Sequence, residues 1–206
     1  MPDAAILWFR QDLRLADNPA LHALEGRPIL PVFVLEEGLG GAARWWLHHS
    51  LAALSRALAE RGAPLVLLRG DPRRVIPELA ARIGAGEVHA GRQCEPAARA
   101  RDAATHAALA EAGGRLVLHR SALLHEPHLV RTGTGKPYSV YTPFSRALFA
   151  QLEPLPPALP APARIAAAPG APEGLGLDAL GLLPRPPEPD WAAEFPAHWT
   201  PGEAGA

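Results

Sequence analysis

Short apolar runs alternate with amphipathic stretches along the first 150 residues of the chain. The apolar runs are rich in Leu, Ile and Val and hardly alternate with polar residues, which is typical of strands in a parallel sheet covered on both faces. They predict five strands, at residues 5–9, 29–35, 64–69, 87–90 and 115–119.

The amphipathic stretches carry helix signals. Residues 41–61 place four leucines at i, i+4, i+7 and i+11, and these form one apolar stripe (Leu47, Leu51, Leu54, Leu58). A second helix is predicted from its ends, because Asp71 can cap it, Pro72 suits the first helical position and Gly84 can end it. A third, alanine-rich helix is predicted at residues 95–112.

This alternation of strands and helices predicts an α/β fold. We expect a doubly wound, Rossmann-like, five-stranded parallel sheet in the order 3-2-1-4-5, with right-handed connections.

The character of the chain changes after residue 150. Thirteen of the 24 prolines lie between Pro154 and Pro201, and proline disfavours both long helices and central strands. The expected organisation is therefore an α/β domain at residues 1–150 and a Pro-rich linker at residues 151–206. Trp191, Phe195 and Trp199 are expected to anchor the linker, which reads as the approach to a second domain.

The composition of the chain limits the classes of partner and compartment that we expect for it. A formal charge of −1 gives no general attraction to nucleic acid or membranes. Cys94 is the single cysteine, which fits a reducing compartment. No apolar run approaches the ~18 residues that a membrane helix needs. We therefore expect a cytoplasmic protein that does not bind membranes.

Several familiar motifs are excluded. The first strand is not followed by the G-x-G-x-x-G of dinucleotide sites. The stretch around Lys136 differs from a phosphate loop, since Pro137 replaces the Ser or Thr that would hold Mg²⁺. His125 and His128 have no third ligand nearby in sequence, so no metal site is predicted.

The ends of the first and fourth strands carry polar residues. In an open parallel sheet, ligands bind beyond the carboxyl ends of strands where the winding direction reverses. If the order is 3-2-1-4-5, the first and fourth strands flank that reversal. The residues predicted to line one crevice there, with the last three at or near its rim, are Arg10, Asp12, Arg92, Gln93, Glu95, Leu35, Glu36 and Arg44. An alternative interpretation is that Arg10, Asp12 and Arg14 form ion pairs that tie down the loop, and both can hold together.

Six stretches then carry a family resemblance. In chain order they are "LWFRQDLRLADNPAL", "ARWWLHHSLAAL", "LLRGDP", "EPAARARD", "LLHEP" and "GKPYSVYTPFSRAL", followed by the linker "LGLLPRPPEPDWAAEF…HWTPGEAGA". Over essentially the whole chain these resemble the amino-terminal α/β domain and interdomain linker of the DNA photolyase/cryptochrome family.

The resemblance implies an antenna-binding domain that holds a folate, a deazaflavin or a flavin mononucleotide (FMN). In that family the antenna passes excitation to FAD in a carboxy-terminal helical domain, which repairs pyrimidine dimers as a deoxyribodipyrimidine photo-lyase. No motif of that helical domain occurs here, so no catalytic residue is assigned. FAD and DNA are expected to bind only through that domain or a partner replacing it, and this chain alone is expected to be inactive in repair.

Two departures from the family bear on the chromophore. Ala97 and Ala98 stand where folate-binding relatives carry Asn and Glu contacts to the folate. Deazaflavin or FMN is therefore expected in preference to methenyltetrahydrofolate. A second functional class stays open: a stand-alone nucleotide-binding or protein-interaction module on the same fold, without light chemistry.

Overall fold

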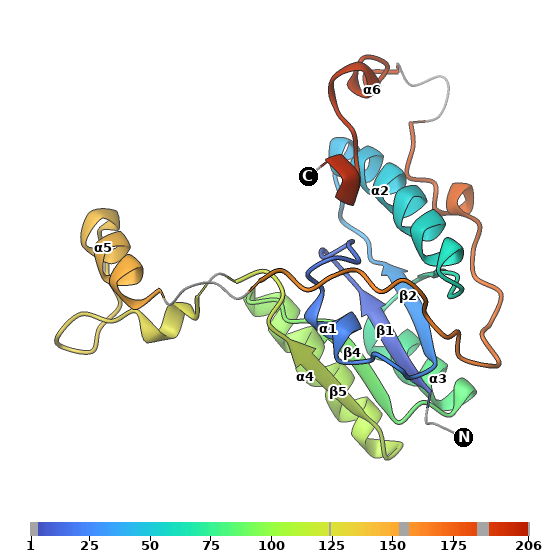
Figure 1. Ribbon diagram of the computed structural model, residues 1–206, viewed down its shortest axis with the longest axis horizontal. Coiled ribbons are helices and arrows are strands. Elements are labelled where there is room, and N and C mark those ends of the chain that lie inside the picture. The colour runs from blue at the N-terminus through green and yellow to red at the C-terminus, as the bar shows by residue number, and fades with distance from the viewer. Residues whose placement is uncertain (1–3, 124, 153–156, 185–189, 206) are drawn as a thin grey trace. The chain divides into compact units, whose positions relative to one another are not determined.

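The strands form one parallel sheet, as the computed structural model of the chain shows (Figure 1). The structure describes residues 4–123, 125–152, 157–184 and 190–205. The sheet order is β3-β2-β1-β4-β5, as predicted. Its strands are β1 (Ala5–Phe9), β2 (Ile29–Leu35), β3 (Val66–Arg69), β4 (Glu87–Gly91) and β5 (Arg115–His119). The centre of the sheet is parallel, since β1 pairs with both β2 and β4 in that sense.

The helices begin and end at the residues that the chain provides for this purpose. The α-helices are α1 (Pro19–His22), α2 (Gly41–Glu60), α3 (Pro72–Ile83), α4 (Pro96–Glu111), α5 (Tyr141–Gln151) and α6 (Phe195–His198). Asp71 caps α3 by accepting a hydrogen bond from the backbone N–H of Arg73, and Gly84 ends that helix at φ 68°. The predicted caps of α3 are thus confirmed, whereas α5 was not among the predicted helices.

Two apolar layers cover the sheet, one on each face. Alternate residues of β1 belong to different layers: Leu7 and Phe9 pack with α1 and α2, whereas Ile6 and Trp8 pack with α3 and α4. All five residues of β1 are at most 1% exposed. This burial explains why the strand reads as a continuous apolar run.

The Pro-rich segment packs against this core. Ile165, Leu180 and Leu182 are buried in the layer that contains α1 and α2. The segment also contributes one isolated parallel bridge to the edge of β2, in which the backbone N–H of Ile29 donates to Ala166 O at 2.8 Å. We expected no sheet structure here, and the described part of this segment adds a single bridge without a strand.

Two strand boundaries differ from the prediction. β3 begins at Val66 and not at residue 64, where proline removes a backbone donor. β4 extends by one residue to Gly91, which pairs with His119.

The chain forms two compact units. The first comprises residues 1–121 and 159–206, and the second comprises residues 122–158. The second unit contains the 3₁₀ turn η1 (Pro127–Leu129) and α5, and in it Tyr138 packs edge-on against Phe144. The predicted domain boundary at residue 150 stays a prediction.

None of the helices in the described parts of the chain is both long and apolar enough to cross a membrane.

Candidate functional site

A cavity of about 640 Å³ lies at the carboxyl edge of the sheet, beyond β1 and β2. It belongs entirely to the first unit of the chain. Its lining comprises Trp8, Arg10, Gln11, Asp12, Leu13, Arg14, Phe33, Val34, Leu35, Glu36, Glu37, Leu39, Ala43, Trp46, Leu47, Ser50, Gln93, Arg101, Gly202, Glu203 and Gly205. This is the position where an open parallel sheet accepts ligands.

Five of the eight residues that the sequence places at this edge line the cavity: Arg10, Asp12, Leu35, Glu36 and Gln93. Arg44 instead lines two smaller neighbouring cavities. Arg92 and Glu95 are outside the lining of the large cavity, and Glu95 is the exposed N-cap residue of α4.

Arg10 forms a buried ion pair beneath the cavity. Its Nη1 lies 2.6 Å from Oδ1 of Asp102 on α4, and both side chains are only 4% exposed. The same guanidinium donates to the carbonyl of Gly91 and lies 4.8 Å from the centre of the Trp8 ring. Arg10 therefore joins the end of β1 to β4 and α4. Asp102 was missed as a partner because 92 residues separate it from Arg10 in the chain.

Asp12 also holds the loop after β1 in place. Its carboxylate accepts hydrogen bonds from Ser121 Oγ at 2.8 Å and from the backbone N–H of Arg10 at 3.2 Å. A Cβ at position 91 would collide with this carboxylate, so the position needs glycine. Arg14 binds the backbone carbonyls of Asp17 and Ser121, and its ion pair with Asp17 is long, at 3.9 Å. The two interpretations of this stretch are thus compatible, since residues that tie down the loop also line the cavity.

Arg101 completes the polar wall. It lies in α4, where its Nη1 donates to Glu36 at 2.7 Å and its Nη2 donates to Gln93. Its guanidinium stands 5.3 Å from the centre of the Trp8 ring. The sequence places Arg101 beside Asp102 on one side of α4, but no motif marks it as a site residue.

Another part of the wall is apolar. It is built from the end of β2, the loop after it and the first turns of α2, with Phe33, Leu39, Trp46 and Leu47 among its residues. A cavity with one charged wall and one aromatic and aliphatic wall suits a planar organic molecule that carries polar substituents at one edge.

The carboxy-terminal segment closes one side of the cavity. The carboxylate of Glu203 accepts hydrogen bonds from the backbone N–H groups of Leu15 at 2.8 Å and Ala16 at 2.7 Å. Nearby, Trp199 meets the ring of Trp46 edge-on, with centroids 6.2 Å apart. The anchoring expected of the linker aromatics is seen here, whereas no sequence signal pointed to Glu203.

The described residues contain no group of three or more His, Cys, Asp or Glu that could hold a metal ion. His128 lies 3.6 Å from Glu126 in the second unit.

The family model for DNA photolyase matches residues 5–163 of the chain. Among curated proteins, the deoxyribodipyrimidine photo-lyase of Agrobacterium fabrum is 45% identical over 98% of this chain and 42% of its own length. Cryptochrome-2 of Arabidopsis thaliana is 32% identical over 100% of this chain and 35% of its own length. The chain thus spans less than half the length of these relatives.

Among solved structures, a bacterial class III photolyase from Agrobacterium tumefaciens superimposes with a TM-score of 0.92 at 42% identity. The match covers 100% of this chain and 43% of that protein. The structural match agrees with the fold predicted from the sequence, and the family model covers most of the chain. The chain belongs to the DNA photolyase/cryptochrome family and corresponds to its amino-terminal α/β domain.

Proposed function

We propose that this chain binds a light-harvesting antenna chromophore in the 640 Å³ cavity at the carboxyl edge of the sheet. The observation that carries the proposal is the pairing of an apolar aromatic wall with a polar wall, of which Arg10, Glu36 and Gln93 are members. The antenna-binding role of this domain in the family supports the assignment. Of the other predicted site residues, Asp12 and Leu35 act at the cavity and Arg44 acts beside it.

Deazaflavin or FMN is the proposed chromophore in preference to methenyltetrahydrofolate. The ranking rests on the family resemblance: Ala97 and Ala98, at the start of α4 and outside the lining of the large cavity, stand where folate-binding relatives carry Asn and Glu contacts, and alanine offers no side-chain hydrogen bond.

Reconstitution tests the proposal. The purified chain is titrated separately with FMN, an 8-hydroxy-deazaflavin and methenyltetrahydrofolate, and binding is followed by the visible absorbance and by chromophore fluorescence. We expect saturable binding of at least one of them, with the two flavin-type molecules tighter than the folate. Tighter folate binding would overturn the ranking.

A matched pair of variants locates the binding site. Ala43 lines the cavity, and the adjacent Ala42 does not, although both are exposed in the first turn of α2. Ala43→Trp fills the cavity and should weaken chromophore binding at least tenfold, whereas Ala42→Trp should leave it unchanged. Equal effects of the two variants would place the chromophore elsewhere.

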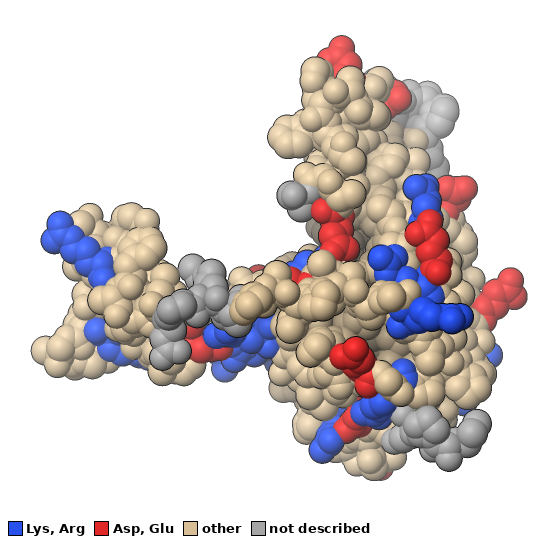
Figure 2. Space-filling view, viewed as in Figure 1, with Lys and Arg blue, Asp and Glu red and all other residues tan. Residues whose placement is uncertain are grey.

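The proposed partner is a helical FAD-binding domain of the kind that the family carries, or a protein that replaces it, and DNA would be reached only through that partner. Exposed aromatic side chains support this assignment, because Trp46 and Trp191 are each 42% exposed and Trp199 is 60% exposed. Figure 2 shows the surface around α6 as mainly uncharged, with a few acidic residues.

The second functional class, a nucleotide-binding or protein-interaction module without light chemistry, makes a different prediction. It requires tight binding of an adenine nucleotide with no visible absorbance and no affinity for any of the three chromophores.

A further inference from the structure

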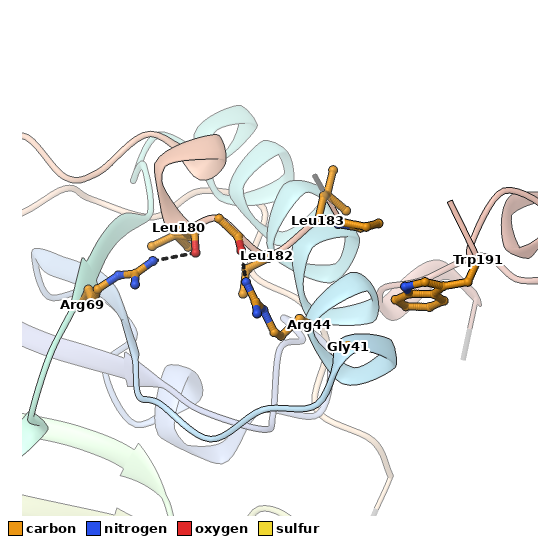
Figure 3. A pocket seen from close by; sticks show the side chains of 9 residues that line it. Gly41, Arg44, Arg69, Leu180, Leu182, Leu183 and Trp191 are labelled. Atoms are coloured by element: carbon orange, nitrogen blue, oxygen red, sulfur yellow. Dashed lines mark hydrogen bonds between the residues drawn. The ribbon is translucent and has the colours of Figure 1, made fainter. Parts of the chain in front are cut away.

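Two smaller cavities lie next to the proposed chromophore site. One has a volume of about 360 Å³ and is lined by the start of α2, by Arg69 at the end of β3 and by the segment that follows η2 (Leu177–Leu180) (Figure 3). The other has a volume of about 220 Å³. Arg44 and Arg69 line both cavities. The 220 Å³ cavity also shares part of its wall with the large cavity, namely Leu35, Glu36, Glu37 and Leu39.

Arg44 and Arg69 each donate to one of two consecutive carbonyl groups. Arg69 Nη2 donates to Leu180 O at 2.6 Å, and Arg44 Nη2 donates to Gly181 O (Figure 3). Each guanidinium has five N–H donors, so most of them stay available. A carbonyl bears no net charge, and within the described parts of the chain no carboxylate forms an ion pair with either arginine.

The described residues around Arg44 and Arg69 leave the electrostatic potential of this region positive. Glu36 is already engaged by Arg101 at 2.7 Å, so Glu37 is the carboxylate of the shared wall that offsets the two arginines. The amino-terminal end of α2 lies here too, with no side-chain cap and no acidic residue in its first turn. The unpaired N–H groups of that turn add further positive potential.

We infer that Arg44 and Arg69 bind the anionic tail of a chromophore whose ring system occupies the large cavity. This inference rests on the proposed function and adds the chemistry of the ligand beyond its ring. The tail is the phosphate of a flavin mononucleotide or, if the ring is a pterin, the glutamate carboxylates of a folate. Phosphate and carboxylate groups are both oxygen anions that guanidinium groups recognise through charge-assisted hydrogen bonds.

FMN and riboflavin test the inference, because they share one ring and differ only by the phosphate. With the full chain, we expect FMN to bind about tenfold more tightly than riboflavin at low salt, and the difference to shrink as ionic strength rises. Methenyltetrahydrofolate and its analogue without glutamate form the second pair, and the pair with the larger difference identifies the source of the anion.

Arg69→Gln assigns the effect to the arginine pair. Glutamine keeps a polar side chain at this position but removes the charge, so this variant should weaken the binding of FMN much more than the binding of riboflavin. Arg73→Gln is the matched control, because Arg73 is exposed, pairs with Asp71 and lines none of the three cavities.

The outcomes separate the two proposals. If riboflavin and FMN bind equally, and the folate pair does likewise, the anionic-tail inference is wrong while the proposed function stands. If Arg69→Gln weakens riboflavin as much as FMN, the arginine acts on the fold and the inference is also wrong. If none of the rings binds, the proposed function fails and the inference falls with it.

Discussion

At the scale of single residues, buried charge is the feature with the largest energetic consequence. The Arg10–Asp102 pair is almost fully enclosed, and Asp102 Oδ2 has no hydrogen-bond partner within the described residues. A buried pair need not stabilise a fold more than apolar residues would, but removing one partner leaves the other charge buried and uncompensated.

Asp102→Asn should therefore lower the free energy of unfolding by about 3 kcal/mol, because Arg10 keeps its charge in a site without a counterion. Chemical denaturation followed by far-UV circular dichroism measures the change. Glu111→Gln, at the exposed end of the same helix, is the control and should shift stability by less than about 0.5 kcal/mol. A loss in Asp102→Asn no larger than in the control would contradict the role given to the pair.

A second residue-scale feature is a cluster between β4 and β5. His89 Nδ1 lies 2.9 Å from His119 Nε2, with the rings stacked, and Glu87 lies 3.4 Å from the other ring nitrogen of His89. Burial lowers the pKa of both histidines from the ordinary 6.5. Hydrogen bonds from Arg27 and Arg115 lower the pKa of Glu87 to about 2.

The sign of the pH dependence follows from these directions. Below pH 6.5 the unfolded chain takes up protons that the folded histidines resist, so stability should fall as the pH drops below about 6.5. Glu87 makes its own contribution to stability above pH 4.5, and that contribution is lost only as the pH falls towards about 2. The loss below pH 6.5 therefore belongs to the histidines whose pKa is lowered by burial, namely His89 and His119 together with His48.

Denaturation midpoints measured across this pH range test the assignment. His89→Gln should flatten the decline, whereas His22→Gln should not, because His22 is half exposed on α1. An unchanged slope in His89→Gln would show that the cluster does not control acid stability.

At the scale of elements, sequence patterns predict those strands and helix ends that depend on residues close together in the chain. The strands read as continuous apolar runs because both faces of the sheet are covered. Asp71 and Gly84 were predictable as the caps of α3 because a side-chain cap and a left-handed glycine act locally. Five predicted residues also line one cavity, because the sheet order brings the carboxyl ends of β2, β1 and β4 next to one another.

The other side-chain contacts of the site join residues far apart in the chain, and no local sequence pattern specifies them. Arg101 reaches Glu36 across 65 residues, and Glu203 reaches Leu15 across 188. Arg44 lies on the predicted rim, but its direction is set by the carbonyl of Gly181, in a segment whose path the prolines do not determine. These partners are fixed by tertiary packing, which becomes visible only in three dimensions.

The carboxy-terminal segment supplies the prediction at this scale. Glu203→Gln replaces an ionised acceptor with a weaker neutral one, so the segment should detach from Leu15 and Ala16 more often. Limited proteolysis within residues 199–205 should become about tenfold faster, and chromophore binding should weaken because Glu203 lines the cavity. Glu194→Gln, an exposed change in the same segment, is the control and should alter neither measurement.

At the scale of the whole molecule, the net charge of the chain bears on its affinity for DNA. The formal net charge is −1, and Figure 2 shows basic and acidic residues interspersed on the face in view. Phosphate contacts supply most of the affinity of proteins for duplex DNA, and a chain with no net positive charge has no general attraction to the phosphate backbone. We expect this chain to bind duplex DNA no better than the weak non-specific range of roughly 10⁻⁴ M at physiological salt.

The final prediction is that residues 1–206 alone do not repair DNA. Repair of a base lesion in a duplex requires a pocket that accepts the flipped nucleotide, and the large cavity here is the one proposed to hold the antenna chromophore. A chromophore bound in it would absorb light without an acceptor, so it should fluoresce strongly. The assay incubates the chain, loaded with its chromophore, with reduced FAD and a dimer-containing oligonucleotide under blue light and counts restored pyrimidines. We expect no repair above the protein-free control; light-dependent repair would mean that this chain holds a catalytic site of its own. Addition of a separately expressed helical FAD domain from a relative should both quench the antenna fluorescence and start repair, because the excitation then has an acceptor and the lesion has a pocket.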